Sequence, residues 1–584
     1  MIDTADRDSS LVDVLRRRAA NTPDRLVLAF LKDGEQESER LTFGTLDARA
    51  RAIAAALQAH GVVAGDRAIL LYPPGLAFMP AFFGCLYAGV LAVPASMPLR
   101  SHHSKTRLLP IFRDCDPCAV LTTASARENY FDILRRAGVS EQVRWLATDE
   151  ISADSSAPMR DVPLSPDTIA FLQYTSGSTS EPKGVMVSHG NLLDNTRFQG
   201  ELFGIRPSSI GLNWMPLSHD MGLIMGVLQP IVHGFMSYVM APMSFIRSPR
   251  RWLAAITRYR VTHSYGPNFA FEECIHRISP DAREGLDLRS WTVACSGAEH
   301  LRHRTLKCFE SAFSPYGFDR RAWLPAYGLA EATLVVSAEQ ASSGITTLAV
   351  DTDALREGRV IESVQDSPCA RTLVAVGKTD TRAVVRVIDP EQRTTCQPDR
   401  IGEIWVKGDS VAKGYWQRPE ESIRTFAARV VDNGEGPFLR TGDLGFVRNG
   451  ALFIASRAKD LIILRGRNYY PQDIELCAET ADSAIRPSSC IAFSVDDGTQ
   501  ECLVVVAELI HSSFTDTQIA CIVENVRQAV QTEHEIRVDF VQLIKRGSLP
   551  KTSSGKLQRA RCRALYCAGE LQLIGENSAG TKIA

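Results

Sequence analysis

The chain has 584 residues, of which 45% are apolar and 23% are charged, proportions that are ordinary for a soluble globular protein. This length exceeds what one hydrophobic core can organise, so about two to four domains are expected. The formal net charge of −2 gives no overall attraction to nucleic acid or to an anionic membrane, and neither partner is expected.

The first third of the chain alternates between helix-like and strand-like segments. Thr45 to His60 is rich in alanine and leucine and stops at Gly61, which predicts a helix with a glycine end. Arg67 to Tyr72 reads as a strand. Leu76 to Leu99 is apolar enough to suggest a membrane span, but prolines and glycines interrupt it. A buried helix leading into a buried strand explains that run better, so no membrane span is predicted.

The fourteen cysteines show no framework of disulfides or metal ligands. Cys115-Asp-Pro-Cys118 is a single C-x-x-C without a second pair or a nearby histidine at zinc spacing. Reduced thiols in a cytoplasmic protein are therefore expected. The N-terminal residues carry no basic segment followed by an apolar one, so no signal peptide is predicted.

A glycine-rich loop, Tyr174-Thr-Ser-Gly-Ser-Thr-Ser-Glu-Pro-Lys183-Gly184, follows the apolar run Ile169 to Leu172. A strand followed by such a loop offers backbone N–H groups and hydroxyls to a polyphosphate. The loop is not a Walker A motif, because no Gly-Lys-Ser/Thr ends it. On its own it is equally well a surface turn. The α/β alternation continues to about residue 335 and predicts largely parallel sheets covered by helices.

The last part of the chain changes character. Two strands are expected at Cys490–Val495 and Cys502–Ile510, and a third at Val538–Ile544. Between them lies a helix whose apolar side chains share one face: Ile519, Ile522, Val523, Val526, Ala529 and Val530. This is an α+β unit large enough to fold alone, with its natural boundary near Ser456–Asp460.

Five further motifs accompany the glycine-rich loop, and each places polar side chains in a turn or beside an apolar strand. They are Trp214 to Leu223, Cys295 to Glu299, Pro325 to Thr333, Leu439 to Gly445 with Ser456 to Glu475, and Leu549 to Lys556. Their order and spacing resemble the acyl-adenylate-forming superfamily of acyl-CoA synthetases, nonribosomal-peptide adenylation domains and luciferases. The resemblance covers nearly the whole chain.

The finer resemblance is to fatty acyl-AMP ligases. It is carried by Leu172 to Thr179, His219 to Leu223, Gly266 to Phe271, Tyr327 to Thr333, Gly408 to Trp416 and Asp460 to Asp473. Two positions depart from that branch. Leu217-Ser218 stands where an aromatic residue is common before the histidine, and Lys183 stands where another residue is often found.

The resemblance implies an α/β adenylate-forming fold. A large N-terminal domain of two doubly wound sheets plus a small β-barrel would span residues 1–456. Residues 457–460 would form a hinge at Lys459, and residues 461–584 a small, mobile α+β lid domain. The stretch 344–377 resembles the insertion of fatty acyl-AMP ligases. After adenylation the lid domain is expected to rotate at the hinge.

The resemblance also implies a site for ATP and Mg²⁺. The β- and γ-phosphates would lie on Thr175, Ser176, Gly177, Ser178 and Thr179, with Lys183 close by. Adenine would lie between Gly297, Ala298 and Glu299 on one side and the segment Tyr327, Gly328, Leu329 and Ala330 on the other. Asp443, assisted by Arg457, would accept hydrogen bonds from the ribose hydroxyls. Thr175 and Glu331 would hold the metal ion.

Three residues are implied to be catalytic: Lys556, Glu331 and His219. Adenylation brings a carboxylate to the α-phosphate, so the site must supply cations and oriented donors. Lys556 would bridge the two anions, a task that suits a flexible ammonium. His219 would gate the carboxylate end of an acyl channel or would cap a local turn. Without the accompanying motifs, Lys556 reads as an exposed loop lysine, Tyr327 as a core aromatic and Asp443 as a turn residue.

Six of the eleven methionines gather in one short region. They are Met215, Met221, Met225, Met236, Met240 and Met243. Flexible thioethers suit the lining of an acyl channel, and they suit an irregular core equally well.

The implied function is ATP-dependent activation of a medium- or long-chain fatty acid to fatty acyl-AMP, with release of pyrophosphate. The acyl group would then pass to the phosphopantetheine thiol of a holo acyl carrier protein, as in polyketide or nonribosomal lipid biosynthesis. The alternative is a fatty acyl-CoA ligase, which shares the first half-reaction. An amino-acid-activating enzyme is disfavoured, because no acid for a substrate ammonium can be assigned. A non-catalytic binding protein is disfavoured because Lys556, Glu331 and Asp443 are all present.

Overall fold

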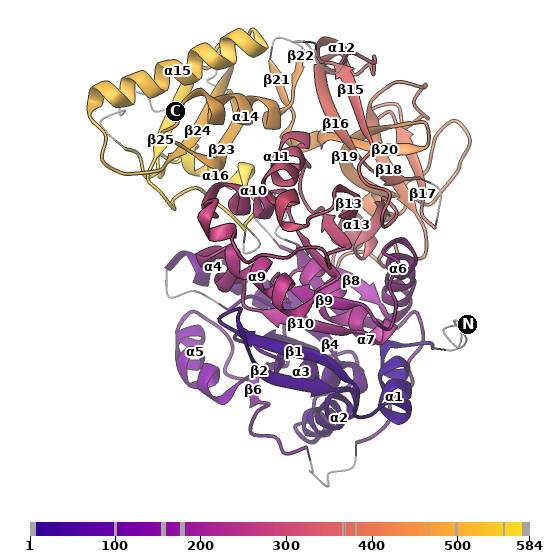
Figure 1. The fold of residues 1–584 in the computed structure, drawn as a ribbon. Helices are drawn as coiled ribbons and strands as arrows, with labels where there is room; N and C mark the ends of the chain where they lie inside the picture. The colour runs from indigo at the N-terminus through magenta and orange to yellow at the C-terminus, as the bar shows by residue number, and fades with distance from the viewer. Residues whose placement is uncertain are drawn as a thin grey trace.

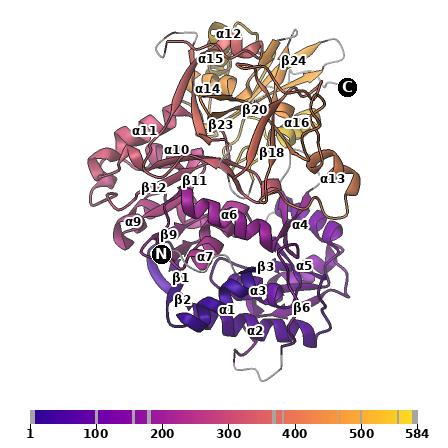
Figure 2. The same cartoon turned by 90° about the vertical axis from the view of Figure 1, so that its right-hand side faces the viewer.

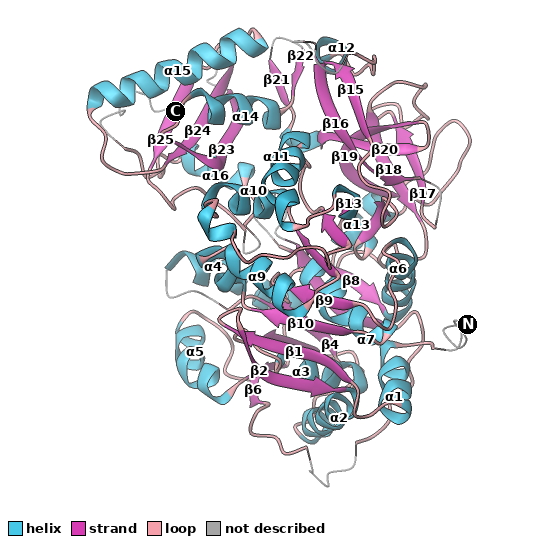
Figure 3. Ribbon diagram, viewed as in Figure 1, coloured by secondary structure: helices cyan, strands magenta, loops and turns pink. Residues whose placement is uncertain are grey.

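The computed structural model describes residues 8–97, 102–153, 159–175, 182–364, 367, 370–379, 382–464, 467–496, 500–552 and 555–574. In Figure 1 the two N-terminal sheets occupy the lower half, with a third sheet above them on the right and the C-terminal elements above on the left. Figure 3 shows helices and strands alternating in the lower half, whereas the upper right consists mainly of strands.

The first sheet has eight strands in the order β14-β13-β12-β11-β9-β10-β1-β2. Its inner strands are parallel, and β2 and β14 are antiparallel edges. The strands are β1 (Leu26–Lys32), β2 (Gln36–Thr42), β9 (Ile210–Asn213), β10 (Met236–Met240), β11 (His263–Gly266), β12 (Val293–Ser296), β13 (Trp323–Gly328) and β14 (Val335–Ala338).

The second sheet has six strands in the order β6-β5-β3-β4-β7-β8, and only β8 runs antiparallel to its neighbour. The strands are β3 (Arg67–Leu71), β4 (Leu91–Ala95), β5 (Ala119–Thr122), β6 (Arg144–Ala147), β7 (Ile169–Thr175) and β8 (Lys183–Ser188). All residues of β4 and β5 are buried, as continuous apolar strands covered by helices on both faces should be.

Helices connect and cover these two sheets (Figure 2). They are α1 (Leu11–Asn21), α2 (Phe43–Ala59), α3 (Phe78–Tyr87), α4 (His102–Cys115), α5 (Ala124–Arg136), α6 (His189–Leu202), the π-helix η1 (Met221–Leu228), α7 (Gln229–His233), α8 (Pro242–Arg247), α9 (Arg250–Tyr259), α10 (Asn268–Arg277) and α11 (His303–Phe313), with short 3₁₀ turns η2 (Asp281–Arg283), η3 (Ser314–Tyr316), η4 (Arg320–Ala322) and η5 (Ala330–Ala332). One continuous hydrophobic core contains side chains from both sheets.

The apolar run that suggested a membrane span is the buried helix α3 followed by the buried strand β4. Among the described helices, none combines the length and apolar character that crossing a membrane requires. The helix expected at Thr45 to His60 is α2, where a capping box of Thr42 and Thr45 sets the start and Gly61, with φ +73°, follows the end.

The third sheet is antiparallel, in the order β15-β16-β20-β19-β18-β17. Its strands are β15 (Thr347–Asp351), β16 (Ala370–Lys378), β17 (Val384–Ile388), β18 (Gly402–Lys407), β19 (Leu439–Arg448) and β20 (Ala451–Arg457), with helices α12 (Thr352–Arg356) and α13 (Pro419–Phe426) beside them. This sheet stands where a small β-barrel was expected. In the described residues its end strands β15 and β17 do not pair with each other, so the sheet is open.

The C-terminal part, defined here as residues 461–574, has a hydrophobic core of its own that runs from Ile462 to Ile574. It follows the short turn η6 (Ala458–Asp460). Its elements are β21 (Ile462–Leu464), β22 (Arg467–Tyr469), α14 (Pro471–Ala481), β23 (Ile485–Asp496), β24 (Glu501–Leu509), α15 (Asp516–His534), β25 (Phe540–Ile544) and α16 (Arg559–Cys567). Helix α10, which follows strand β11 of the first sheet, lies against β23 in both views (Figures 1 and 2).

Candidate active site

A tyrosine, an aspartate and an arginine meet where the first and third sheets approach each other. Tyr327 of β13 donates from its hydroxyl to Asp443 Oδ2 at 2.7 Å, and Arg457 Nε donates to Asp443 Oδ1 at 3.1 Å. Asp443 and Arg457 are paired residues of β19 and β20, which explains why the two side chains lie side by side. The Asp443 carboxylate is buried, whereas 54% of the Arg457 side chain is exposed. The cluster therefore presents a guanidinium at the edge of a buried carboxylate, whose negative charge raises the pKa of Arg457.

A second cluster joins the glycine-rich loop to the turn η5. Glu331 Oε1 accepts a hydrogen bond from the hydroxyl of Tyr415 at 2.9 Å. Lys183 Nζ lies 5.0 Å from the centre of the Tyr415 ring and forms an ion pair with Glu421. Thr175 pairs with Lys183 across β7 and β8. Burial raises the pKa of Glu331.

Ser176, Gly177, Ser178 and Thr179, which were expected to hold phosphates, lie outside the described residues. The ends of their loop, Thr175 and Lys183, lie on the side of the molecule where Tyr415 and Glu331 meet. Tyr415 and Glu421 were not predicted as site residues from the sequence. The signal for Tyr415 was its place in the segment Gly408 to Trp416.

The proposed walls of the adenine pocket are built by close backbone approach. A Cβ atom on Gly297 would lie 2.7 Å from the carbonyl oxygen of Ala326, and one on Gly328 would lie 1.7 Å from that of Leu334. Ala298 follows with φ +70°, in the left-handed region. Only glycine fits the first two positions, so the two segments are held against neighbouring backbone.

Lys556, on the loop before α16, lies among acidic groups of the N-terminal region. Burial lowers its pKa, while the charges of Asp220 and Glu299 act in the opposite direction. Asp220 is bonded to His219, with Nδ1 at 2.7 Å from Oδ1, and to the backbone N–H of Met221 at 2.7 Å. Burial would raise the pKa of Asp220, but His219, Lys556 and the Met221 N–H lower it to about 2. The motif around His219 thus contributes the charged carboxylate of Asp220 beside Lys556. No role for Asp220 was predicted from the sequence.

The Lys556 loop packs directly on helix α10. Glu299 Oε1 accepts a hydrogen bond from the backbone N–H of Phe269 at 2.7 Å. Gly555 has φ +89°, and a Cβ atom there would lie 2.5 Å from Cζ of the Phe269 ring. The contact leaves no room for a side chain, so the ammonium of Lys556 is brought to the site by close packing.

The expected hinge residue Lys459 is exposed in η6. Its neighbour Asp460 is not free, because Asp460 Oδ2 lies 3.2 Å from Nη1 of Arg559, which also binds Glu475 at 2.7 Å. Arg559 is three residues beyond Lys556, so the hinge and the Lys556 loop are linked by one arginine.

The expected insertion, residues 344–377, contains β15, α12 and most of β16. This segment contacts the C-terminal part through two arginine side chains and one backbone carbonyl. Arg371 Nη1 lies 3.0 Å from Asp473 Oδ2, and Leu355 O accepts the hydroxyl of Tyr470 at 3.0 Å. Arg356 donates to Nδ1 of His534 at 3.2 Å.

One other group of metal-ligand types occurs in the described residues. Cys477, Glu533 and His534 place one ligand atom each within 4.8 Å of one another. The guanidinium of Arg356 donates to His534, so a cation already faces this group. A hard-cation site is better matched by the oxygen ligands of Glu331 and Thr175.

The methionines divide between core and surface. Met215, Met221, Met225 and Met240 are buried, whereas 47% of Met243 is exposed. Met225 lines a small internal cavity together with Phe203, Phe235, His263, Tyr265 and Cys295. Four of the six methionines therefore belong to the core, and Met225 also borders this small cavity.

Comparison with known proteins agrees with this arrangement. The AMP-binding enzyme family matches residues 15–416, and the Disco-interacting protein 2-like AMP domain matches residues 459–576. The medium-chain-fatty-acid–[acyl-carrier-protein] ligase JamA of Moorena producens (strain JHB) is 44% identical over 568 residues, which are 96% of each chain.

Two solved structures cover almost the whole chain. A fatty acid AMP ligase from Legionella pneumophila is 38% identical and superimposes with a TM-score of 0.76 over 98% of this chain and 99% of that one. A fatty acyl-adenylate ligase from L. pneumophila, in complex with acyl adenylate and pyrophosphate, is 37% identical with a TM-score of 0.75 over 98% of each chain.

The α/β fold and the matched segments define an acyl-adenylate-forming ligase. Within that class, the chain belongs to the AMP-binding enzyme family and to its fatty acyl-AMP ligase branch. The resemblance of its motifs is thereby confirmed, as are the adenylate-forming fold and an ATP-dependent activity.

Proposed function

We propose that this enzyme activates a medium- or long-chain fatty acid with ATP and passes the acyl group to the phosphopantetheine thiol of a holo acyl carrier protein. The observation that carries the proposal is the position of Lys556. Its loop packs on Phe269, and its ammonium faces Asp220 and Glu299, with Arg457 also near. A cation from the C-terminal part thus lies beside the proposed adenine wall, where two anions must be joined.

Lys556 would act by electrostatics. The fatty acid carboxylate and the α-phosphate of ATP repel each other, and an ammonium between them lowers that repulsion where negative charge builds up. Asp220 and Glu299 favour the charged form of Lys556 against the effect of burial. His219 would orient Asp220 through their 2.7 Å contact and would border the carboxylate end of the acyl channel.

Asp443 would bind the ribose hydroxyls, with Arg457 completing the polar edge and Tyr327 packed beside adenine. The buried Asp443 carboxylate is already oriented by its two donors, so little ordering is left for substrate binding. Gly297 to Glu299 and Gly328 to Ala330 would supply the flat backbone walls.

Thr175 and Glu331 would hold Mg²⁺ with oxygen ligands, the type that this ion prefers. When bound, the ion offsets phosphate charge. The chain's own contribution is to orient the Glu331 carboxylate through Tyr415, whose ring also lies 5.0 Å from Lys183 Nζ.

Two observations support an acyl carrier protein rather than coenzyme A as the acceptor. The match to JamA spans 96% of each chain, and JamA is named as an acyl-carrier-protein ligase. The segment 344–377 contacts the C-terminal part through Arg371, Leu355 and Arg356, so it can influence which acceptor reaches the site. We further propose a domain division at residues 1–456, 457–460 and 461–584, rotation at Lys459, and a cytoplasmic location.

The test is a mass-spectrometric assay with fatty acids of mixed chain length and ATP·Mg²⁺, run alone, with coenzyme A, and with a holo acyl carrier protein. Acyl-AMP that disappears on adding the carrier protein, with acyl-carrier product formed and no acyl-CoA, is the expected result. Efficient acyl-CoA formation would instead assign the enzyme to the alternative, a fatty acyl-CoA ligase. Absence of adenylate with every acid would refute the substrate proposal.

A further inference from the structure

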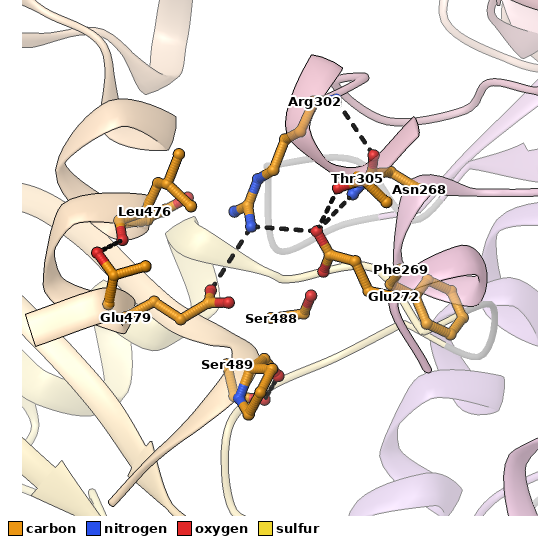
Figure 4. A network of polar contacts seen from close by, with 12 residues as sticks. Asn268, Phe269, Glu272, Arg302, Thr305, Leu476, Glu479, Ser488 and Ser489 are labelled. Carbon is orange, nitrogen blue, oxygen red and sulfur yellow. Dashed lines mark hydrogen bonds and ion pairs between the residues drawn. The ribbon is translucent and has the colours of Figure 1, made fainter. Parts of the chain in front are cut away.

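One arginine lies between carboxylates of the N-terminal region and of the C-terminal part. Arg302 immediately precedes α11, and its Nη1 is 3.5 Å from Glu272 Oε1 of α10 and 3.5 Å from Glu479 Oε2 of α14 (Figure 4). The exposed fractions of these side chains are only 15%, 10% and 12%. The three groups therefore form a mostly buried ion triad that joins the two regions.

The two carboxylates of the triad are supported very differently. Glu272 Oε1 also accepts hydrogen bonds from Thr305 Oγ1 at 2.7 Å and from Asn268 Nδ2 at 3.0 Å. Among the described residues, Glu479 Oε2 has no hydrogen-bond partner, and its ion pair is with Arg302. A backbone hydrogen bond from Ser488 also favours the Glu479 carboxylate, but the cation that compensates its charge among the described residues is Arg302, from the other region.

A second ion pair crosses the same interface with the opposite polarity. Arg486 of β23 lies 3.7 Å from Glu273 of α10, and it also contacts Glu508 of its own part at 2.6 Å. Glu272 and Glu273 are adjacent, so the two pairs lie next to each other on α10. A shift that moved Glu479 toward Glu273 would bring like charges together, which disfavours that register.

Helix α10 also carries the contact that places Lys556. The ring of Phe269 in α10 packs against Gly555, and the Phe269 backbone N–H donates a hydrogen bond to Glu299. On the other side of the interface, Lys551 donates to Ser489 Oγ at 3.1 Å, and Ser488 and Ser489 lie beside the triad (Figure 4). The ion triad and the Lys556 loop are therefore fixed to the same helix at neighbouring points.

We propose that Arg302 is a positioning residue for adenylation, which through Glu479 holds the C-terminal part where Lys556 faces Asp220 and Glu299. This inference rests on the proposed function, in which Lys556 serves adenylation and the C-terminal part later moves. Arg302 touches no reacting atom; it acts on the equilibrium between the docked and the rotated arrangement.

The charges make a specific prediction about variants. In Arg302→Gln the docked arrangement buries the Glu479 carboxylate without a cation, and rotation returns that carboxylate to water. In Glu479→Gln no unpaired charge is buried, since Arg302 still forms its ion pair with Glu272. Breaking one side of a buried pair is far more harmful than removing both charges. Glu479→Gln should therefore partly rescue Arg302→Gln.

The experiment measures two half-reactions separately on the full-length enzyme. Adenylation is followed as pyrophosphate release from ATP and fatty acid, and transfer as loading of a holo acyl carrier protein from supplied acyl-AMP. We expect Arg302→Gln to slow adenylation about tenfold and Glu479→Gln about threefold, with the double variant close to the latter. Transfer should stay within about twofold of wild type, because the triad contributes only to the docked arrangement. Glu524→Gln, on the exposed face of α15, is the matched control.

A distance measurement tests the positioning directly and does not depend on activity. Spin labels on the exposed thiols of Cys308 in α11 and Cys521 in α15, with other reactive cysteines replaced by serine, report how the two regions sit. Arg302→Gln should broaden the distance distribution, and Glu479→Gln should narrow it again. An unchanged distribution in Arg302→Gln, or additive losses without rescue, would overturn the inference. A wild-type enzyme that forms no acyl-AMP yet shows the predicted distances would refute only the proposed function.

Discussion

Lys556 shows how one side chain depends on two regions of the chain. Its backbone belongs to the C-terminal part, and the carboxylates that favour its charge, Asp220 and Glu299, belong to the N-terminal region. Lys556→Gln should lower the rate of pyrophosphate release about 10²- to 10³-fold, the usual effect of removing one oriented charge from a transition state. Lys545→Gln, an exposed lysine of the same part, should leave the rate unchanged. Equal rates in the two variants would contradict the assigned role.

The pH dependence of adenylation should report the ionisation of the same lysine. Burial lowers the pKa of Lys556, and the protonated ammonium is the active form. The rate should therefore fall as pH rises through this lowered pKa, before an ordinary lysine would lose its proton. Lys556→Arg keeps its charge at every accessible pH, so its alkaline decline should move to higher pH even if its maximal rate is lower. An identical alkaline decline in wild type and Lys556→Arg would assign it to another group.

At the scale of elements, the Lys556 loop packs closely on α10 at Gly555 and Phe269. Gly555→Ala should slow adenylation about tenfold, since the new Cβ meets the Phe269 ring and a left-handed backbone disfavours alanine by roughly 1–2 kcal/mol. Gly569→Ala is the matched control, because Gly569 also has positive φ, +69°, but has nothing within 4 Å of its Cβ position.

The collision can be separated from the backbone strain by a second substitution. Phe269→Leu, introduced with Gly555→Ala, should recover part of the adenylation rate, because the shorter side chain makes room for the methyl group. Pyrophosphate release by both variants checks this. If Gly569→Ala is as slow as Gly555→Ala, packing on Phe269 has no part in the defect.

Much of the element structure could be predicted from the sequence. Apolar spacing and end residues give strong local signals in three segments. These are the helix predicted at Thr45 to His60, the buried helix and strand in Leu76 to Leu99, and the α+β unit near the C-terminus. The barrel expected from the resemblance is an open sheet in the described residues. Closure of a sheet depends on pairing between distant strands, for which a local pattern carries no information.

The candidate site was less accessible to sequence reasoning, for a similar reason. Lys556, Glu331, Asp443 and Tyr327 were selected through their motifs, and their roles stay predictions. Asp220, Tyr415 and Arg302 were not selected, because their roles arise from contacts across large sequence separations: Tyr415 with Glu331, Arg302 with Glu479 and Asp220 with Lys556. In the sequence, charged and hydroxyl-bearing side chains of this kind cannot be told from ordinary surface residues, because their partners lie near them only in the folded protein.

At the scale of the whole molecule, the two proposed half-reactions require two arrangements of the C-terminal part. In the present one the Lys556 loop is docked, and Lys459 is exposed in the connecting turn. Lys459→Pro fixes the backbone angle φ at this turn and should hinder rotation. Transfer from supplied acyl-AMP should fall by about tenfold or more while pyrophosphate release stays near wild type. Lys459→Ala should affect neither, and a proline variant with both half-reactions intact would refute the hinge.

In the proposed reaction the fatty acid is activated as an acyl-adenylate before it reaches a thiol. It is tested most directly by supplying a fatty acid with ¹⁸O in its carboxylate, together with ATP, Mg²⁺ and a holo acyl carrier protein, and weighing the AMP that is released. Attack of the carboxylate on the α-phosphate leaves one ¹⁸O bridging the acyl group and AMP. Cleavage of the acyl–oxygen bond by the thiol then leaves that ¹⁸O on the phosphate, so we predict singly labelled AMP and acylated carrier in equal amounts. Acylated carrier formed with unlabelled AMP, or with ADP and phosphate, would contradict it.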